Sequence, residues 1–136
     1  MTTKTKECPL EDDECVVFSD WLKINNIPHA HIANESRSSS RNAMIRGAKL
    51  KRMGQSRGVW DYEIYVPIKG ITGRVDCYEL VKIEMKRQKG GTVSPEQKAW
   101  KKIYEMSGIR CKVCKGAEDA IEFVKSIVED YDLAEE

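Results

Sequence analysis

Apolar and polar residues follow two different periods along the chain, and these periods divide it into eight elements. A spacing of three to four residues between apolar positions predicts a helix, while alternation at every second position predicts a strand. The predicted helices are 9–25, 42–53, 95–107 and 117–131. The predicted strands are a short piece within 29–34, then 62–66, 81–87 and 111–115. This order predicts an α/β fold in which a small mixed β-sheet is flanked by helices.

The third predicted helix has the clearest boundaries. Ser94 is a favourable N-cap, Pro95 fits the first helical position, and Gln97 can complete a capping box with Ser94. Gly108 is a typical helix end. The apolar residues of this helix, which we expect on one side, are Ala99, Trp100, Ile103 and Met106.

Turn residues separate the two central strands. Pro67, Gly70 and Gly73 predict a turn over 67–73. Because proline cannot donate a backbone hydrogen bond, Pro67 is expected to limit how far the first of these strands continues.

The length of 136 residues predicts a single domain. We expect this domain to span 9–131, between a disordered N-terminal stretch at 1–8 and an acidic tail at 132–136. No apolar run approaches the roughly 18 residues of a membrane span, and the N-terminus lacks the apolar region of a signal peptide. An intracellular, cytoplasmic protein with no membrane partner is therefore expected.

The net charge of +1 conceals a separation of charge along the chain. Residues 36–60 include seven basic residues and no acid, whereas acids gather near both ends of the chain. A basic segment of this kind can bind a polyanion such as DNA, or it can be merely solvated. The candidate DNA-binding residues within it are Arg46, Lys49, Lys51, Arg52 and Arg57.

The five cysteines are expected to be reduced thiols inside a cell. Cys111 and Cys114 have the spacing of a metal-binding pair, but no second close pair supplies the remaining ligands of a structural zinc. On a strand, moreover, positions i and i+3 face opposite sides. These residues are therefore interpreted as small apolar side chains rather than as a zinc site.

The candidate chemistry lies in one acid and one Glu-x-Lys triplet. Asp61 directly precedes a predicted strand, and Glu84 and Lys86 alternate with apolar residues in the next one. Because residues two apart on a strand share a face, Glu84 and Lys86 should point the same way, and Asp61 could join them from the neighbouring strand. Two carboxylates and a lysine can assemble a divalent metal for phosphodiester cleavage. A bare Glu-x-Lys triplet is also common on an ordinary solvated face.

Four short motifs occur along the chain in the order HIANE (31–35), GAKLKRMG (47–54), GVWD (58–61) and IEMKR (83–87), the last followed by SPEQ (94–97). Together they resemble the VRR-NUC nucleases, a branch of the PD-(D/E)XK, or restriction-endonuclease-like, superfamily. The resemblance covers about residues 10–128, and it departs from the family at Trp60, where the family usually has proline. It implies a restriction-endonuclease-like fold of the small stand-alone type.

The resemblance implies a role for each residue of the candidate site. Asp61 and Glu84 would hold Mg²⁺ or Mn²⁺, which prefer carboxylate oxygens. Lys86 would contact the scissile phosphate or the attacking water, and Gln97 would lie beside the site on the following helix. The candidate catalytic residues are thus Asp61, Glu84, Lys86 and Gln97. Alternatively, Gln97 serves only its capping box.

Two further acids are candidate metal ligands. Glu14 lies on the first helix, and first-helix acids supply a carboxylate in related nucleases. Glu35 belongs to the first of the resembling motifs. The alternatives are that Glu14 belongs to a solvated acidic face and that Glu35 is a loop acid with no role in the site.

The activity implied by the resemblance is metal-dependent hydrolysis of DNA phosphodiester bonds by an endonuclease. Small stand-alone members look like enzymes selective for branched DNA such as Holliday junctions. The compact size and the lack of a separate recognition domain suggest a phage-encoded or mobile-element protein in a bacterial host. Paired incisions need two active sites, so a homodimer is expected by analogy. The rivals are a nicking or flap nuclease, a restriction-like nuclease, and a catalytically inactive nucleic-acid-binding protein. The complete set of Asp61, Glu84 and Lys86 argues against the last.

Overall fold

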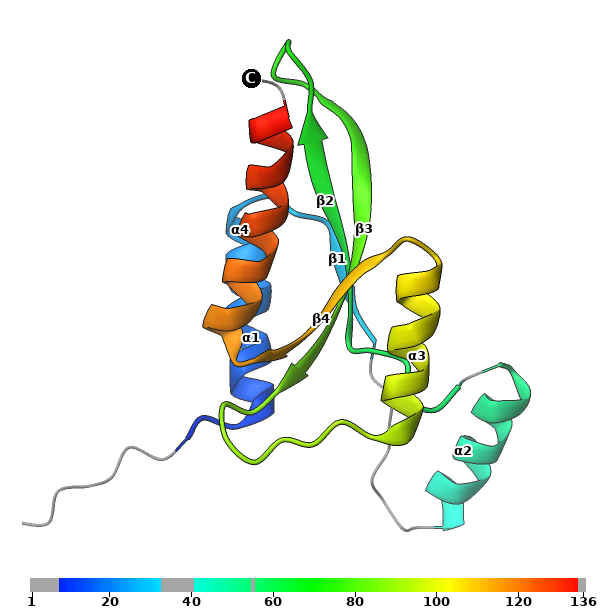
Figure 1. Cartoon of the computed structure of the whole chain (residues 1–136). Helices are drawn as coiled ribbons and strands as arrows, with labels where there is room; N and C mark the ends of the chain where they lie inside the picture. Colours follow the sequence, from blue (N-terminus) through cyan, green and yellow to red (C-terminus); the bar gives the residue numbers. More distant parts are fainter. Residues whose placement is uncertain (1–7, 33–40, 55, 135–136) are drawn as a thin grey trace, which may run out of the picture.

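The structure is a computed structural model of the chain and describes residues 8–32, 41–54 and 56–134 (Figure 1). The elements of this part of the chain follow the predicted order, which confirms the α/β class. The helices are α1 (Glu11–Ile24), α2 (Arg41–Arg52), α3 (Pro95–Met106) and α4 (Ala117–Ala134). The strands are β1 (His29–His31), β2 (Tyr62–Lys69), β3 (Val75–Lys86) and β4 (Arg110–Lys115).

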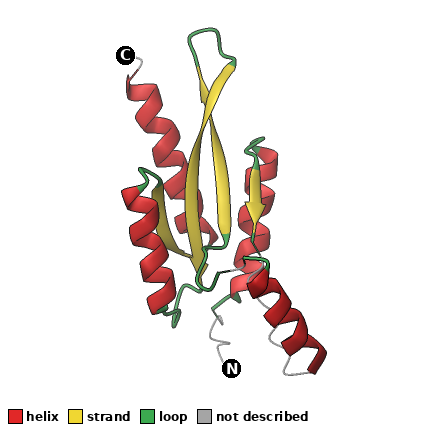
Figure 2. Cartoon of the chain, turned by 90° about the vertical axis from the view of Figure 1, so that its right-hand side faces the viewer, coloured by secondary structure: helices red, strands yellow, loops and turns green. Residues whose placement is uncertain are grey.

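The four strands form one mixed sheet in the order β1-β2-β3-β4. β1 pairs with β2 and β2 pairs with β3 in antiparallel fashion, whereas β3 and β4 are parallel. α3 makes the crossover between those two parallel strands. β2 and β3 extend beyond the other strands as a projecting hairpin (Figure 2).

One face of the sheet carries the hydrophobic core. α1 and α4 lie side by side on this face, and α3 covers part of the opposite face (Figure 1). Alternate residues of the two central strands point into the core, so each strand contributes every second side chain. Its fully buried members include Phe18, Leu22, Tyr62, Ile64, Val81, Ile83, Met85 and Val124.

The apolar side of α3 is not the side that contacts the sheet. Ile103 and Met106 are 48% and 79% exposed, and the buried residue of the helix is instead Tyr104. The helix contacts the polar face of the sheet rather than the apolar core. The side of the helix that faces the sheet therefore carries an aromatic residue with a hydroxyl group, and the aliphatic stripe is left toward solvent.

The prediction that Pro67 limits its strand is also wrong. β2 continues through Pro67, which pairs with Tyr78, and ends at Lys69. β1 pairs only with Tyr62–Ile64, so β2 is an edge strand by the time it reaches Pro67. Proline is tolerated there because no strand on that side needs its missing N–H.

Helix α2 lies to one side of the rest of the molecule (Figure 1). It carries the predicted basic residues, and its side chains Met44 and Ile45 are exposed as well. Within the described residues, no helix is long and apolar enough to cross a membrane.

Candidate metal-binding active site

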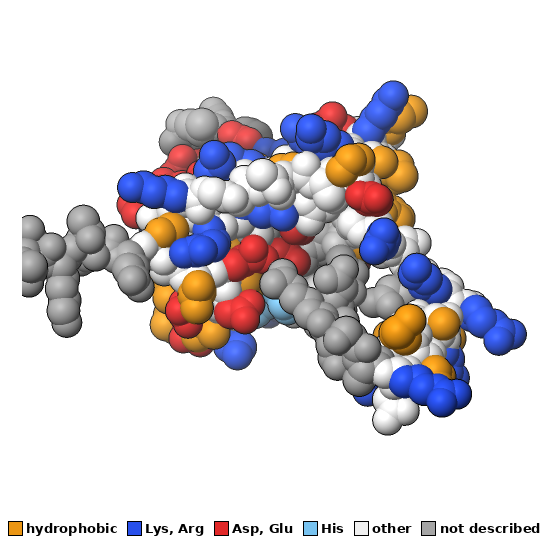
Figure 3. Space-filling model, turned by 90° about the horizontal axis from the view of Figure 1, so that it is seen from below, with side chains coloured by type: hydrophobic (Ala, Val, Ile, Leu, Met, Phe, Trp, Pro, Cys, Tyr) orange, Lys and Arg blue, Asp and Glu red, His pale blue; other side chains and the backbone are white. Residues whose placement is uncertain are grey.

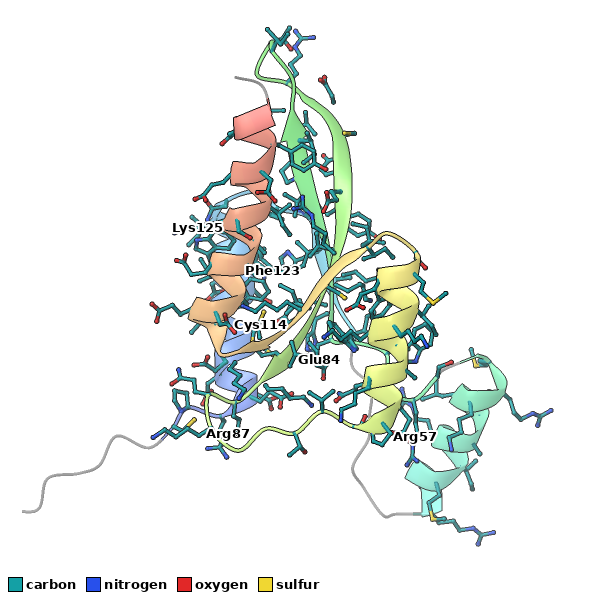
Figure 4. All side chains as sticks on the ribbon, in the orientation of Figure 1. Arg57, Glu84, Arg87, Cys114, Phe123 and Lys125 are labelled. Carbon is teal, nitrogen blue, oxygen red and sulfur yellow. The ribbon has the colours of Figure 1, made fainter. Side chains whose placement is uncertain are left out.

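The strand β3 brings Glu84 and Lys86 to the face of the sheet that α3 covers. Ile83 and Met85, which alternate with them, are fully buried in the core on the other side. This confirms the predicted division of the strand into an apolar and a polar face. Figure 4 shows Glu84 near the end of β3, between that strand and α3.

Asp61 and Glu84 are joined by reciprocal hydrogen bonds between their two segments. The backbone N–H of Asp61 donates to Oε2 of Glu84 at 3.0 Å. The backbone N–H of Met85 donates to Oδ2 of Asp61 at 3.1 Å. These bonds hold the two carboxylates on adjacent strands and confirm the prediction that the sheet brings them together.

The carboxylate pair is electrostatically unfavourable without a cation. Glu84 is only 2% exposed, and burial, followed by the nearby charge of Asp61, raises the pKa of Glu84 to about 7. Burial also raises the pKa of Asp61, while the hydrogen bond from Met85 and the nearby His31 oppose that rise. A buried and a half-buried carboxylate that repel each other are a suitable donor set for a hard divalent cation.

Lys86 contributes a positive charge at the edge of the pair. Its Nζ lies 3.5 Å from Oε1 of Glu84, and its side chain is 13% exposed. The chain passes close to it again at Gly91, where an added Cβ would lie 2.9 Å from the Cβ of Lys86. Lys86 is therefore held beside the carboxylates with its ammonium group near the protein surface.

Gln97 takes part in both of the roles considered for it. Its Oε1 accepts a hydrogen bond from the backbone N–H of Ser94, and the hydroxyl of Ser94 accepts one from the backbone N–H of Gln97. At the same time its Nε2 donates to Oε1 of Glu84 at 2.6 Å. The capping box and the contact with the site are thus made by the same side chain.

The structure directs Glu14 away from this pair. Glu14 is 7% exposed, and its carboxylate accepts hydrogen bonds from the backbone N–H of Ala117 and from Nε2 of Gln88. It therefore neutralises the positive end of α4. Glu35 lies outside the described residues.

Glu11, which lies one helical turn before Glu14, was not among the candidate ligands. Its negative charge contributes to the raised pKa of both Asp61 and Glu84. The run of four acids at the start of α1 was the available signal, but the run alone could not show which acid faces the sheet. Among the described residues, no three His, Cys, Asp or Glu side chains converge as a complete metal site. A metal here would therefore take its remaining ligands from water or substrate, as Mg²⁺ usually does.

The candidate DNA-binding residues are exposed and lie outside the carboxylate pair. Arg46, Lys49, Lys51 and Arg52 are on α2, and Arg57 is in the segment that leads to β2. Viewed from below, acidic side chains gather in the middle of this face, with Lys and Arg side chains around them and on α2 (Figure 3).

Cys111 and Cys114 do not face each other. In the register of β3 and β4 they lie opposite Lys82 and Met85, which point to different faces of the sheet. Cys114 is buried in the core and Cys111 is half-buried on the other side. Burial raises the pKa of the Cys114 thiol to about 12, which suits a small apolar side chain rather than a ligand.

Comparison with known proteins identifies the fold. No family model and no curated protein matches the chain. The chain is similar to a solved structure described as a "VRR_NUC domain protein", with a TM-score of 0.65 and 21% sequence identity. The match covers 90% of this chain and 91% of that protein. The protein therefore has the fold of a VRR_NUC domain, the fold that the sequence motifs predicted.

Proposed function

We propose that this protein is a divalent-metal-dependent DNA endonuclease of the VRR-NUC type. The observation that carries the proposal is that Asp61, just before β2, lies against the buried Glu84 of β3, with Lys86 of β3 beside Glu84. Its similarity in fold to a VRR_NUC domain protein supports the same reading. An inactive nucleic-acid-binding protein is less consistent with the site, because none of these three groups has been lost.

Asp61 and Glu84 would hold Mg²⁺ or Mn²⁺ through their carboxylate oxygens. An ion held there would supply an acidified water and would offset charge on the phosphate. Lys86 would orient the attacking water or stabilise the developing charge. Gln97 holds Glu84 from the side through its amide, so that Oε2 remains fixed against the backbone of Asp61.

The DNA backbone would run from this site toward the basic helix α2. Phosphate contacts from Arg46, Lys49, Lys51, Arg52 and Arg57 would position the duplex without reading its bases. Replacing Arg46, Lys49 and Arg52 together by alanine should lower affinity and flatten its salt dependence. The expected change is about 0.9 in slope for each of up to three lost contacts, measured by titration at several salt concentrations. If the DNA affinity and its salt dependence are unchanged, α2 does not contact DNA and its basic residues are simply solvated.

We further propose that the enzyme selects branched DNA such as a four-way junction and acts as a homodimer. Two coordinated incisions require two copies of a site of this size. The alternatives within the same chemistry are a nicking or flap nuclease and a restriction-like nuclease. Their substrates differ, so activity assays can separate them.

The test is to incubate the purified protein with Mg²⁺, Mn²⁺ or EDTA and labelled duplex, single-strand, flap and four-way-junction DNA. Paired, metal-dependent incisions in the junction alone would support the proposal in full. Metal-dependent cutting of every substrate would retain the nuclease and reject the selectivity. Tight binding without cutting by any metal would establish the inactive DNA-binding protein instead.

A further inference from the structure

Trp60 joins helix α3 to the start of β2 at two points. Its indole Nε1–H donates to the backbone carbonyl of Gln97 at 3.0 Å. Its own backbone N–H donates to the hydroxyl oxygen of Tyr104 at 3.3 Å, and the two rings meet edge to face with centroids 5.4 Å apart. Trp60 is fully buried, so it contacts the first turn of α3 and a point about two turns further along with no competing water.

The chain just before Trp60 lies directly against the same helix. A Cβ added to Gly58 would be 2.6 Å from the carbonyl carbon of Glu96, and Gly58 has a φ of +80°. A larger residue here would push the first turn of α3 away and would also be strained. The spacing between this segment and the helix is therefore closely defined.

These contacts form part of a closed ring that includes the active site. Trp60 binds the carbonyl of Gln97, the side chain of Gln97 binds Oε1 of Glu84, and Oε2 of Glu84 accepts the N–H of Asp61. Asp61 is the next residue after Trp60, which closes the ring. A shift of the indole would therefore move Gln97 relative to both carboxylates.

We propose that Trp60 is a positioning residue, which sets the geometry of the two carboxylates by holding Gln97 at the correct distance from Glu84. The inference rests on the proposed nuclease function. It assigns to Trp60 the role of fixing Gln97, and through Gln97 the carboxylate of Glu84. A proline at this position, which the resemblance predicts, has neither of the two N–H donors that Trp60 uses.

The matched control is Trp100, which lies on α3, the helix that Trp60 contacts. Its indole Nε1–H also donates to a backbone carbonyl at 3.0 Å, that of Arg57. Its ring also packs against Tyr104, with centroids 5.7 Å apart. No hydrogen bond of Trp100 leads to Gln97, so its replacement removes an equivalent bond outside the ring.

The experiment compares Trp60→Phe, Trp100→Phe and the parent protein by three measurements. These are kcat on the cleaved DNA, Kd for that DNA in Ca²⁺, and the exchange rate of the Gln97 side-chain amide by NMR. We expect Trp60→Phe to lower kcat about 10-fold, to leave Kd within about twofold, and to speed the amide exchange. Trp100→Phe should change none of these by more than about twofold.

A double-mutant cycle tests the route through Gln97. In a Gln97→Met background, Trp60→Phe should have little further effect on kcat, because the group through which it acts is already gone. An undiminished effect in that background would overturn the proposal, and so would native kcat and native amide exchange in Trp60→Phe. If Trp60→Phe fails to fold, Tyr104→Phe replaces it, since that change removes only the hydroxyl that accepts the N–H of Trp60.

The nuclease function and the positioning role of Trp60 can be rejected by different results. A parent protein that cuts no DNA with any metal would reject the proposed function. The amide exchange of Gln97 would then still decide whether Trp60 holds that side chain, because this measurement needs no catalysis.

Discussion

The two faces of the central sheet use burial in different ways. The face covered by α1 and α4 buries only apolar side chains of β3, namely Val81, Ile83 and Met85. The face covered by α3 buries Lys82 and Glu84, at 3% and 2% exposure, from the same stretch of strand. Burial of apolar groups stabilises the fold, whereas burial of charges costs free energy. The first face therefore stabilises the fold, whereas the second face holds the charged groups of the proposed active site.

The sharpest test of this division is to remove the buried carboxylates. Glu84→Ala or Asp61→Ala should lower cleavage by at least about 10³-fold, because the metal loses a ligand and several kcal/mol of charge stabilisation. DNA binding should remain within a few-fold, since the basic surface is intact. The checks are single-turnover rate and Kd. A variant that cuts at the parent rate with the same metal would contradict the site assignment.

The neighbouring residue Ile83 should show the opposite effect. Ile83→Ala creates a cavity in the core and should reduce the free energy of unfolding by about 2–5 kcal/mol. Cleavage by the fraction that remains folded should stay near the parent value. Urea unfolding and activity below the transition provide the two measurements. A stable but inactive Ile83→Ala variant would contradict the division of the sheet into a stabilising face and a face that carries the proposed site.

The pH dependence of the free energy of unfolding should show what it costs to bury the charged carboxylate of Glu84. Because burial raises the pKa of Glu84 to about 7, the metal-free native state holds a proton that the unfolded chain releases near its ordinary value of 4.5. Stability should therefore fall as pH rises from about 4.5 to about 7, by up to about 3 kcal/mol. Thermal unfolding without metal measures this.

The control is Glu84→Gln. Because glutamine does not titrate, the stability of this variant should change less between about pH 4.5 and about pH 7 than that of the parent protein. Mg²⁺ should restore stability at the higher pH, because the metal binds the deprotonated carboxylate. A parent protein whose stability rises over this range would show that other groups dominate.

The smallest effect is expected for the buried ammonium of Lys82. It lies 3.5 Å from Oε1 of Glu63 and 5.2 Å from the ring centre of Tyr104, and burial lowers its pKa. Lys82→Met should change stability by no more than about 1 kcal/mol, in either direction, because an apolar residue avoids the desolvation cost. Glu63 is partly exposed and stays hydrated without its partner. A loss above about 3 kcal/mol would show that the pair stabilises the fold.

The sequence was sufficient wherever the information is local. Periodicity predicted the order of the elements, the shared face of Glu84 and Lys86, and the capping box at Ser94, because each depends on residues a few positions apart. Sequence patterns could not predict which side of a helix packs against its neighbours, because that depends on contacts between residues far apart in the chain. The hydrogen bond from Ala117 to Glu14, and the burial of Tyr104 rather than Met106, both follow from how a helix is rotated against its neighbours.

The alternation of β3 has a consequence for how this protein can change over evolutionary time. Its odd-numbered positions 81, 83 and 85 carry the core, and its even-numbered positions 84 and 86 carry the candidate site, so substitutions in either series can accumulate independently. Insertion or deletion of one residue would exchange the two series, placing charges in the core and apolar side chains at the candidate site. We therefore expect β3 to tolerate many changes of residue but no change of length.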